Sequence, residues 1–499
     1  MHLDQSAIKP ILLCDANRYK RNLLLKTRAP VPIVIAILCM TALLGGCDNT
    51  ELKPWHTEIL EKEYSADRAD DITTLAEYLQ LEAALFAELE QTIYASSATG
   101  PAEALERYSR GSRADPQQRQ PNWNRTFELA NKAPEAGVLL LHGMSDSPYS
   151  LRALGETLQN RGYTVLGLRM PGHGTLPSGL LDLQWQDMAA VVKLGVKHLA
   201  QQAPGERLYI IGYSTGAALA LDYVLNQSSS TAQQAALPPV ERLVLISPAI
   251  GVSPAAALAK WSRRLSQLPG LDRLAWLDIE PEFDPYKYNS FATNAGEQVY
   301  ELTRSVAHRL ANRPADAPPL PPMLVLKSTV DATVSNNAVV DRLLLKLPPE
   351  RDELVVFDIN RVAANSSLLI KDPGPFTTRM IADQQLPFTL TLVTNSDTNT
   401  REVAAYTKLP YAAGHSHTEH LKQAWPASVF SLSHVALPFP PSDALYGRQR
   451  PAGSTQIFLG EQAMQGERGV LKIPGDFLLR LRHNPFYRYL QARVLQWLE

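Results

Sequence analysis

The sequence predicts an α/β protein with a doubly wound, mostly parallel sheet, a helical cap insertion and an N-terminal helical prefix. The first observation is an apolar, strand-like run at 208–213 that meets the motif Gly-Tyr-Ser-Thr-Gly at 212–216, after which small residues of helical character follow. The second is that short apolar runs alternate with helical segments from residue 137 onward, a pattern typical of parallel sheets. The third is length, because 499 residues can hold one large α/β domain with additions.

The composition is that of a globular protein. Apolar residues make up 45% of the chain and charged residues 20%. The formal net charge of −2 gives no support for binding to nucleic acid. We therefore expect a folded protein with no nucleic-acid partner.

The N-terminal segment has the pattern of a secretion signal. Basic residues precede an uncharged stretch at 29–46, and its apolar part at 31–44 is too short to span a bilayer comfortably. The stretch ends in Leu-Gly-Gly-Cys at 44–47, which resembles the lipobox of bacterial lipoproteins, in which the cysteine is acylated and becomes the new N-terminus. The alternative is a plain anchor helix with a chance cysteine.

The lipobox resemblance implies a signal peptide at 1–46 and a lipid anchor on Cys47. The protein would then be held on the periplasmic or outer face of a membrane, and Asp48 favours the inner membrane. A tether and helical prefix would occupy 47–122. Within it, apolar residues at helical spacing in 72–94 predict an amphipathic helix packed on the main domain. The polar stretch 109–122 is interpreted as a linker.

The main domain is expected at 123–499. Strands are predicted at 125–129, 137–141, 163–168, 208–213, 242–246, 323–327, 353–357 and 388–393. Helices are predicted at 148–162, 185–200, from 215, at 296–312 and at 484–499. Two insertions interrupt the alternation, a helical cap at about 250–322 and a second insertion at about 360–427. Apolar cap residues either line an acyl site or form an ordinary cap core; they are Trp261, Leu265, Leu268, Trp276 and Leu277.

Ser214 is the candidate nucleophile. A serine at a sharp strand-to-helix turn has a strained backbone, so bulky neighbours are excluded and Gly212 and Gly216 fit that need. The helix that starts at Thr215 would direct its N–H groups and positive dipole end toward a developing anion. The alternative is a glycine-rich turn with an incidental serine.

Three motifs together resemble the α/β-hydrolase superfamily, in its monoglyceride-lipase, lysophospholipase and serine-aminopeptidase-like branch. They are His-Gly at 142–143, Pro-Gly-His-Gly at 171–174 and Gly-Tyr-Ser-Thr-Gly at 212–216. The resemblance covers about 124–334 well and the remainder in patches. It implies an oxyanion hole formed by the backbone N–H groups of Met144 and Thr215. We interpret His142 and His173 as residues that brace loops and not as bases.

The same resemblance implies an acid just past the strand at 323–327, where Asp331 lies; the alternative is that Asp331 caps the next helix. The base is expected soon after 353–357, but no histidine occurs there. We assign the base to His434, because it ends the apolar, strand-like run 429–433. Its imidazole should lie within hydrogen-bond reach of Ser214, with Asp331 on its other nitrogen.

Three further histidines remain open as alternatives for the base. His415, His417 and His420 occupy a polar stretch, which we interpret as a solvated loop. With Glu419 they could instead form a metal site, although no further ligand is evident.

The resulting prediction is a membrane-tethered serine hydrolase of carboxylic esters, with lipid monoesters or lysophospholipids as substrates and no metal or cofactor. One alternative is a peptidase or amidase that holds a substrate amine with Glu280, Glu282 and Asp284. An acyltransferase and a non-catalytic lipid-binding lipoprotein are also open. The sequence does not indicate an oligomeric state.

Overall fold

The computed structural model describes residues 51–68, 71–203, 205, 207–228, 237–251, 266, 270–331, 336–362, 372–427, 429–460 and 481–499. Apart from Glu51, they all belong to one unit, Leu52–Glu499. The predicted signal peptide, Cys47 and three of the apolar cap residues (Trp261, Leu265 and Leu268) lie outside the described residues.

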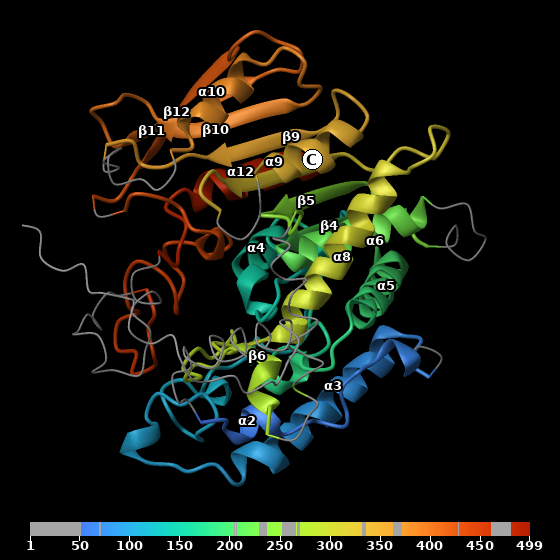
Figure 1. The fold of residues 1–499 in the computed structure, drawn as a ribbon, viewed down its shortest axis with the longest axis vertical. Coiled ribbons are helices and arrows are strands. Elements are labelled where there is room, and N and C mark those ends of the chain that lie inside the picture. Colours follow the sequence, from blue (N-terminus) through green and yellow to red (C-terminus); the bar gives the residue numbers. More distant parts are fainter. Residues whose placement is uncertain are drawn as a thin grey trace, which may run out of the picture. The chain divides into compact units, whose positions relative to one another are not determined.

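In the part of the chain that the structure describes, ten strands form one sheet, in the order β1-β3-β2-β4-β5-β8-β9-β10-β11-β12. Their bounds are β1 Phe127–Leu129, β2 Gly137–Leu141, β3 Thr164–Leu168, β4 Leu208–Tyr213, β5 Arg242–Ile246, β8 Met323–Ser328, β9 Glu353–Phe357, β10 Thr389–Asn395, β11 Glu402–Lys408 and β12 His417–Ala424. The seven strands from β3 to β10 run parallel, whereas β1, β11 and β12 pair antiparallel with their neighbours. The predicted parallel sheet is therefore present (Figure 1).

The strand order positions one edge of the sheet for function. After β2 the chain adds β3 on one side and β4 on the other, so the direction of winding reverses next to β2. In sheets of this kind, ligands bind outside the carboxyl ends of the strands at such a reversal. The ends of β2 and β4 are in register there, with Leu141 opposite Gly212.

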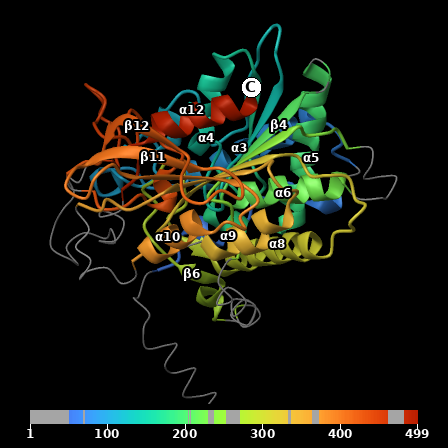
Figure 2. The same ribbon diagram turned by 90° about the horizontal axis from the view of Figure 1, so that it is seen from above.

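Helices cover both faces of the sheet, which explains the continuous apolar runs of its central strands. Helices α4 (Tyr149–Gln159) and α12 (Tyr487–Leu498) lie on one face. Helices α5 (Trp185–Gln202), α6 (Thr215–Gln227), α8 (Thr293–Ala311) and α9 (Asn336–Arg342) lie on the other (Figure 2). Leu490, Val494 and Leu498 of α12 are fully buried, so the prediction of a C-terminal helix packed on the core is confirmed.

The N-terminal prefix packs on the domain as predicted. Helix α3 (Leu75–Leu89) begins with a capping box between Thr74 and Glu77 and continues as a π-helical turn at Glu90–Tyr94. Its buried residues Leu75 and Tyr78 belong to the same core as α5. A short helix α2 (Pro54–Thr57) precedes it. None of the described helices is long and apolar enough to cross a membrane.

The interpretation of 109–122 as a linker is wrong. Ala114 and Asp115 are fully buried, and the Asp115 carboxylate accepts hydrogen bonds from the N–H groups of Gly111 and Gln117. The N–H of Ile457 donates to the carbonyl of Arg113, so the segment packs against a distant part of the chain. Its polar residues therefore form turns inside the fold and do not indicate exposure.

The cap region contains a small sheet as well as helix. Strand β6 (Trp276–Asp278) pairs antiparallel with β7 (Phe291–Ala292) before α8 begins. Trp276 is buried, with its ring 5.1 Å from that of His56 in the prefix, whereas Leu277 is 60% exposed. Trp276 is thus a core residue. Short 3₁₀ turns lie at Ala66–Arg68, Pro101–Glu103, Pro116–Gln118, Pro177–Leu180, Asp272–Ala275, Leu344–Lys346 and His434–Ala436.

The second insertion extends the main sheet. It contributes helix α10 (Gly374–Ala382) and strands β10 to β12, which continue the sheet beyond β9 (Figure 1). His417 and His420 therefore lie on the edge strand β12, opposite Thr407 and Ala404, and not in the expected solvated loop. Six of the eight residues of β12 are polar and none is buried, so the strand lacks the apolar pattern from which strands are predicted.

Candidate active site

Ser214 sits at the predicted sharp turn between β4 and α6. Its backbone has φ 55° and ψ −115°, a strained conformation for a residue with a side chain. A Cβ on Gly212 would lie 2.5 Å from the backbone of Ala217, and one on Gly216 would collide with the carbonyl oxygen of Leu141. The two glycines therefore allow the turn for the expected steric reason. The Ser214 N–H donates to the carbonyl of Ile246, which fixes the turn to β5.

The turn after β2 lies directly against Ser214. A Cβ on Gly143 would be 3.2 Å from the Cβ of Ser214. Met144 follows at this turn, and Thr215 opens helix α6. Among the described residues, neither the Met144 N–H nor the Thr215 N–H has a hydrogen-bond acceptor. Two backbone donors on either side of the serine are the arrangement that an oxyanion hole requires.

Tyr288 fixes this turn to the next loop. Its N–H donates to the carbonyl of Ser145 (2.8 Å), a residue that itself has φ 61°. Its hydroxyl accepts a hydrogen bond from the Thr175 N–H (2.8 Å) and donates to the carbonyl of Gly172 (3.1 Å). Tyr288 thus connects the Met144 turn, through its backbone, with the loop that carries Pro-Gly-His-Gly, through its hydroxyl.

His142 and His173 brace these loops, as predicted. Nδ1 of His142 bonds the carbonyl of Gly143 (2.9 Å), and Nε2 accepts from the Met170 N–H (3.1 Å). Nδ1 of His173 bonds the carbonyl of Pro171 (2.8 Å). Burial lowers the pKa of His142 well below its usual range and that of His173 to about 4, so both rings are neutral at pH 7. Neither ring is placed to act as the base for Ser214.

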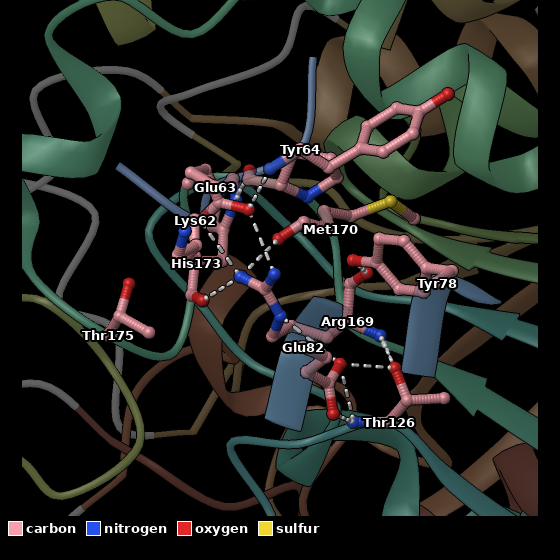
Figure 3. A network of polar contacts seen from close by, with 12 residues as sticks. Lys62, Glu63, Tyr64, Tyr78, Glu82, Thr126, Arg169, Met170, His173 and Thr175 are labelled. Carbon is pink, nitrogen blue, oxygen red and sulfur yellow. Dashed lines mark hydrogen bonds and ion pairs between the residues drawn. The ribbon is translucent and has the colours of Figure 1, made fainter. Parts of the chain in front are cut away.

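A buried arginine, which the sequence analysis missed, holds the same loop. Arg169 follows β3, and its guanidinium pairs with Glu63 (2.9 Å) and Glu82 (3.2 Å), two carboxylates of the prefix (Figure 3). It also donates to the carbonyl of His173 (2.8 Å). The signal was an arginine directly after a buried strand, but its partners lie about 90 to 100 residues away along the chain.

The structure brings together two of the predicted site residues that are far apart in sequence. Nδ1 of His434 lies 2.9 Å from Oδ2 of Asp331, across 103 residues of chain. The Asp331 side chain is fully buried and that of His434 is 11% exposed. The His434 ring also lies beside that of Tyr213, the residue before Ser214, with 5.3 Å between ring centroids. Among the described side chains, no hydrogen bond joins Ser214 to His434, so their expected contact stays a prediction.

The ammonium group of Lys327 shares this Asp331 oxygen with His434. Nζ of Lys327, on β8, also lies 2.9 Å from Oδ2, and the Lys327 side chain is buried. Burial alone would raise the pKa of Asp331, but the hydrogen bonds and charges of His434 and Lys327 hold it well below its usual range. Burial lowers the pKa of Lys327, against the pull of Asp331. A single lysine in an otherwise apolar strand was the signal for this contact.

His434 reaches this edge in a different way from the one predicted. Residues 429–433 do not form a strand in the described part of the chain, and His434 opens a 3₁₀ turn. The backbone is instead held by Asn360, just past β9, whose side chain and N–H bond the carbonyls of Val429 and Phe430 (both 2.8 Å). Asn360 thus anchors the segment at the carboxyl edge without a strand ladder.

The other candidate residues do not gather at the site. Among the described residues, no group of three or more His, Cys, Asp or Glu side chains could hold a metal ion. The Glu282 carboxylate is buried and accepts the N–H groups of Asn289 and Ser290. The Asp284 carboxylate is likewise occupied, by the Tyr446 hydroxyl among others. These two acids therefore support the fold and are not available to bind a substrate amine.

Two of the cavities lined by described residues are large enough to hold a small molecule. One of about 690 Å³ lies between the prefix and residues 116–127, and one of about 530 Å³ lies beside α10. Neither is lined by Ser214 or His434. The larger one includes Gly174 and Thr175 of the loop that Tyr288 holds.

Part of the chain is similar to known proteins. Residues 132–359 match the family model described as Serine aminopeptidase, S33. The match includes Ser214 and Asp331 and ends before His434. Over 85 residues the chain is 36% identical to the thermostable monoacylglycerol lipase of Bacillus sp. (strain H-257). That stretch is 17% of this chain and 33% of the relative, so the chain spans about a third of that protein's length.

Several solved structures are similar over about half of the chain. A metagenome-derived lipolytic enzyme is 21% identical with a TM-score of 0.37, covering 47% of this chain and 87% of its own. The monoacylglycerol lipase of Paleococcus ferrophilus is 19% identical with a TM-score of 0.35, covering 47% and 88%. At these scores the structures add nothing to the argument, and the fold assignment depends on the sheet and on the family match.

Proposed function

The chain is a member of the α/β-hydrolase superfamily, in its monoglyceride-lipase-like branch, and from this premise we propose that it hydrolyses carboxylic esters through Ser214, His434 and Asp331. The observation that carries the proposal is the hydrogen bond between His434 and Asp331 at the sheet edge where Ser214 turns into its helix. A base whose second nitrogen is held by a buried carboxylate is the arrangement that activates a serine.

The geometry supports a reaction in two stages. Ser214 Oγ attacks the acyl carbonyl while His434 Nε2 takes its proton, and Asp331 stabilises the imidazolium that forms. The N–H groups of Met144 and Thr215 bind the oxyanion of the tetrahedral intermediate, each contributing about 3 kcal/mol. His434 then returns the proton to the leaving alcohol, which breaks the ester bond and leaves an acyl-serine. Water, deprotonated by His434, hydrolyses the acyl-serine by the same steps.

The proposed substrates are lipid monoesters, with lysophospholipids as the second choice within the same class. The name of the Bacillus relative, a monoacylglycerol lipase, supports the first choice. The occupied carboxylates of Glu282 and Asp284 argue against the amine-binding site that an aminopeptidase would need.

The test is a substrate panel with the purified protein. Wild type should hydrolyse monoacylglycerols and aryl esters, and Ser214→Ala should lose on the order of 10⁴-fold or more in kcat. Ser150→Ala, which removes a different buried serine hydroxyl, is the matched control and should retain activity. Hydrolysis of aminoacyl amides in preference to esters, or normal ester hydrolysis by Ser214→Ala, would overturn the proposal.

We also propose that Cys47 carries a lipid that tethers the enzyme to a membrane. The proposal depends on the apolar stretch at 31–44 and the Leu-Gly-Gly-Cys motif that ends it. Cys47→Ser should remain uncleaved and unlipidated, whereas Cys39→Ser should be processed normally. An unmodified Cys47 in membrane fractions, detected by mass spectrometry, would contradict the tether.

A further inference from the structure

The larger cavity has the size of a ligand site and lies apart from the proposed nucleophile. Its volume of about 690 Å³ is within the range of about 300–1,000 Å³ typical of small-molecule pockets. Helix α3 of the prefix forms one side and residues 116–127 form the other. Neither Ser214 nor His434 contributes to its lining, so it is not the acyl site of the reaction proposed above.

Much of the lining is apolar and aromatic. Phe86 and Leu89 project from α3, and Trp123 and Phe127 face them from the other side. The rings of Trp123 and Phe127 meet edge to face, with 5.0 Å between centroids. Such surfaces suit a hydrocarbon chain, since each buried methylene contributes favourably to binding.

The charge in the lining is positive and incompletely paired. The Arg125 guanidinium lies 4.1 Å over the Phe86 ring and is half-buried. It makes no hydrogen bond or ion pair with any residue that the structure describes. Burial lowers the pKa of Arg125, with Glu82 opposing and Arg169 adding to the effect, which indicates that its charge is under-compensated.

The other charged groups in the lining leave that cation available. Glu90 is the acidic residue among them, and its carboxylate is already bound to Arg110 and to the Gln117 amide. Arg107 is buried, and its hydrogen bonds go to neutral acceptors such as the carbonyls of Gly174 and Asp284. Its Nε has no partner among the described residues. An anionic head group is therefore favoured at this end of the cavity.

We propose that this cavity binds a long-chain fatty acid as its carboxylate, with the head group on Arg125 and the chain against Phe86, Trp123 and Phe127. Charge complementarity selects the anion, and the apolar lining selects a single hydrocarbon chain. A fatty acid is also the acid product of lipid ester hydrolysis, so the ligand would be present wherever the enzyme acts. The binding can be tested separately from the proposed catalysis, in a protein in which Ser214 is replaced by Ala.

The test uses Trp123 as a reporter in full-length Ser214→Ala protein. A fatty acid brominated along its hydrocarbon chain quenches the fluorescence of only those tryptophans that it contacts. The protein contains seven tryptophans. We expect saturable quenching that disappears when Trp123 is replaced by Phe. Lengthening the chain should tighten binding by up to about four-fold per methylene.

Head-group recognition is tested by charge and by ligand. Arg125→Met should weaken binding of the acid by about 10- to 100-fold, Arg125→Lys should restore part of it, and the brominated fatty alcohol should be insensitive to both changes. Arg161→Met removes an equal charge from an exposed position that does not line the cavity, and it should have no effect. Unfolding midpoints of all variants establish that each is folded.

Three results would overturn the proposal. Quenching that persists unchanged in Trp123→Phe would show that the chain binds elsewhere. Equal affinity of the wild-type cavity for acid and alcohol would show that Arg125 does not recognise a carboxylate. Tighter binding of a phosphate-headed single-chain lipid than of the fatty acid would reassign the ligand and reject the carboxylate.

Discussion

A lysine and a histidine meet one carboxylate oxygen at the centre of the site. Oδ2 of Asp331 lies 2.9 Å from both Nδ1 of His434 and Nζ of Lys327. The field of the carboxylate is therefore shared, and in the proposed acyl transfer the imidazolium would gain less from Asp331 than it would without Lys327. Lys327 also keeps Asp331 ionised, as the low pKa of that carboxyl shows.

Replacing Lys327 by Met should move the acid limb of kcat/KM to higher pH, by about one to two pH units. The sign follows from charge: without the lysine, Asp331 stabilises the protonated imidazole more strongly, and the protonated form is inactive. Met fills a similar volume without a charge. A pH–rate profile on a soluble monoester measures the shift.

The carboxyl of Asp146, near the same edge of the sheet, changes its protonation in the pH range of the acid limb. Burial raises the pKa of Asp146 to about 6, and Asp146 lies close enough to act on Tyr213, beside the His434 ring. The shift of the acid limb caused by Lys327→Met should therefore also occur in a protein that carries Asp146→Asn. An acid limb that stays in place when Lys327 is replaced would mean that the lysine is only a structural partner.

The residues of the site were predictable to different degrees. Ser214 and Asp331 follow apolar strands, so their place at the carboxyl edge could be predicted from the sequence. His434 could be assigned by order in the chain, but its support by Asn360 could not, because 429–433 is apolar and yet pairs with no strand. Lys327 signalled a buried contact without indicating its partner.

The prefix and the loop after β3 form a single structural element through Arg169. Two carboxylates of the prefix, Glu63 and Glu82, neutralise a guanidinium that also holds the His173 carbonyl (Figure 3). The prefix therefore fixes a loop that Tyr288 links to the Met144 turn. It is part of the catalytic scaffold and not a passive spacer.

Glu82→Ala should destabilise the protein by about 3 kcal/mol, because it leaves a buried arginine short of one counter-charge. Activity should fall with it, as the loop loses its fixed position. Urea unfolding and kcat on one ester are the measurements. Glu61→Ala, at an exposed position of the same prefix, should change the free energy of unfolding by less than about 0.5 kcal/mol. Equal stability of the two variants would contradict this role.

Among the helices and strands, the spacing of apolar residues predicted those that are packed into the core on either face of the sheet. The strands from β2 to β10 and helices α3 and α12 have that pattern. Strand β12 at the sheet edge was missed because almost all of its residues are polar, and β11, which pairs with it, was missed as well. The stretch 109–122 was misread because Asp115 accepts hydrogen bonds from N–H groups within it, and because its contact with Ile457 joins residues far apart in the sequence.

At the scale of the whole domain, several buried carboxyl groups have raised pKa values. Burial, with the nearby charge of Glu282, raises the pKa of Glu106 to about 8, and burial raises that of Glu282 to about 7. Between the ordinary value near 4.3 and these values, the folded state binds more protons than the unfolded state. Stability contributed by these groups is therefore lost as pH rises through 7 and 8. Buried histidines such as His56 and His173 act in the opposite sense, but only below about pH 6.5.

The free energy of unfolding should therefore fall by about 2 kcal/mol between pH 6.5 and 8.5. Glu106→Gln should flatten that decline, because it removes the carboxyl with the higher pKa of the two, whereas Glu61→Gln, at an exposed position, should not. Denaturant unfolding at a series of pH values measures the slope. Stability that rises across this interval, or an unchanged slope in Glu106→Gln, would refute the assignment.

The central claim, that Ser214 is a nucleophile activated by His434, is tested most directly by active-site labelling. A fluorophosphonate probe followed by peptide mass spectrometry should locate one adduct on Ser214. Its rate should fall by about 10³-fold or more in His434→Ala and remain near wild type in His420→Ala, which changes a histidine of the edge strand. An adduct on another serine would contradict the account, as would full-rate labelling of His434→Ala together with loss of labelling in a His415 or His417 variant.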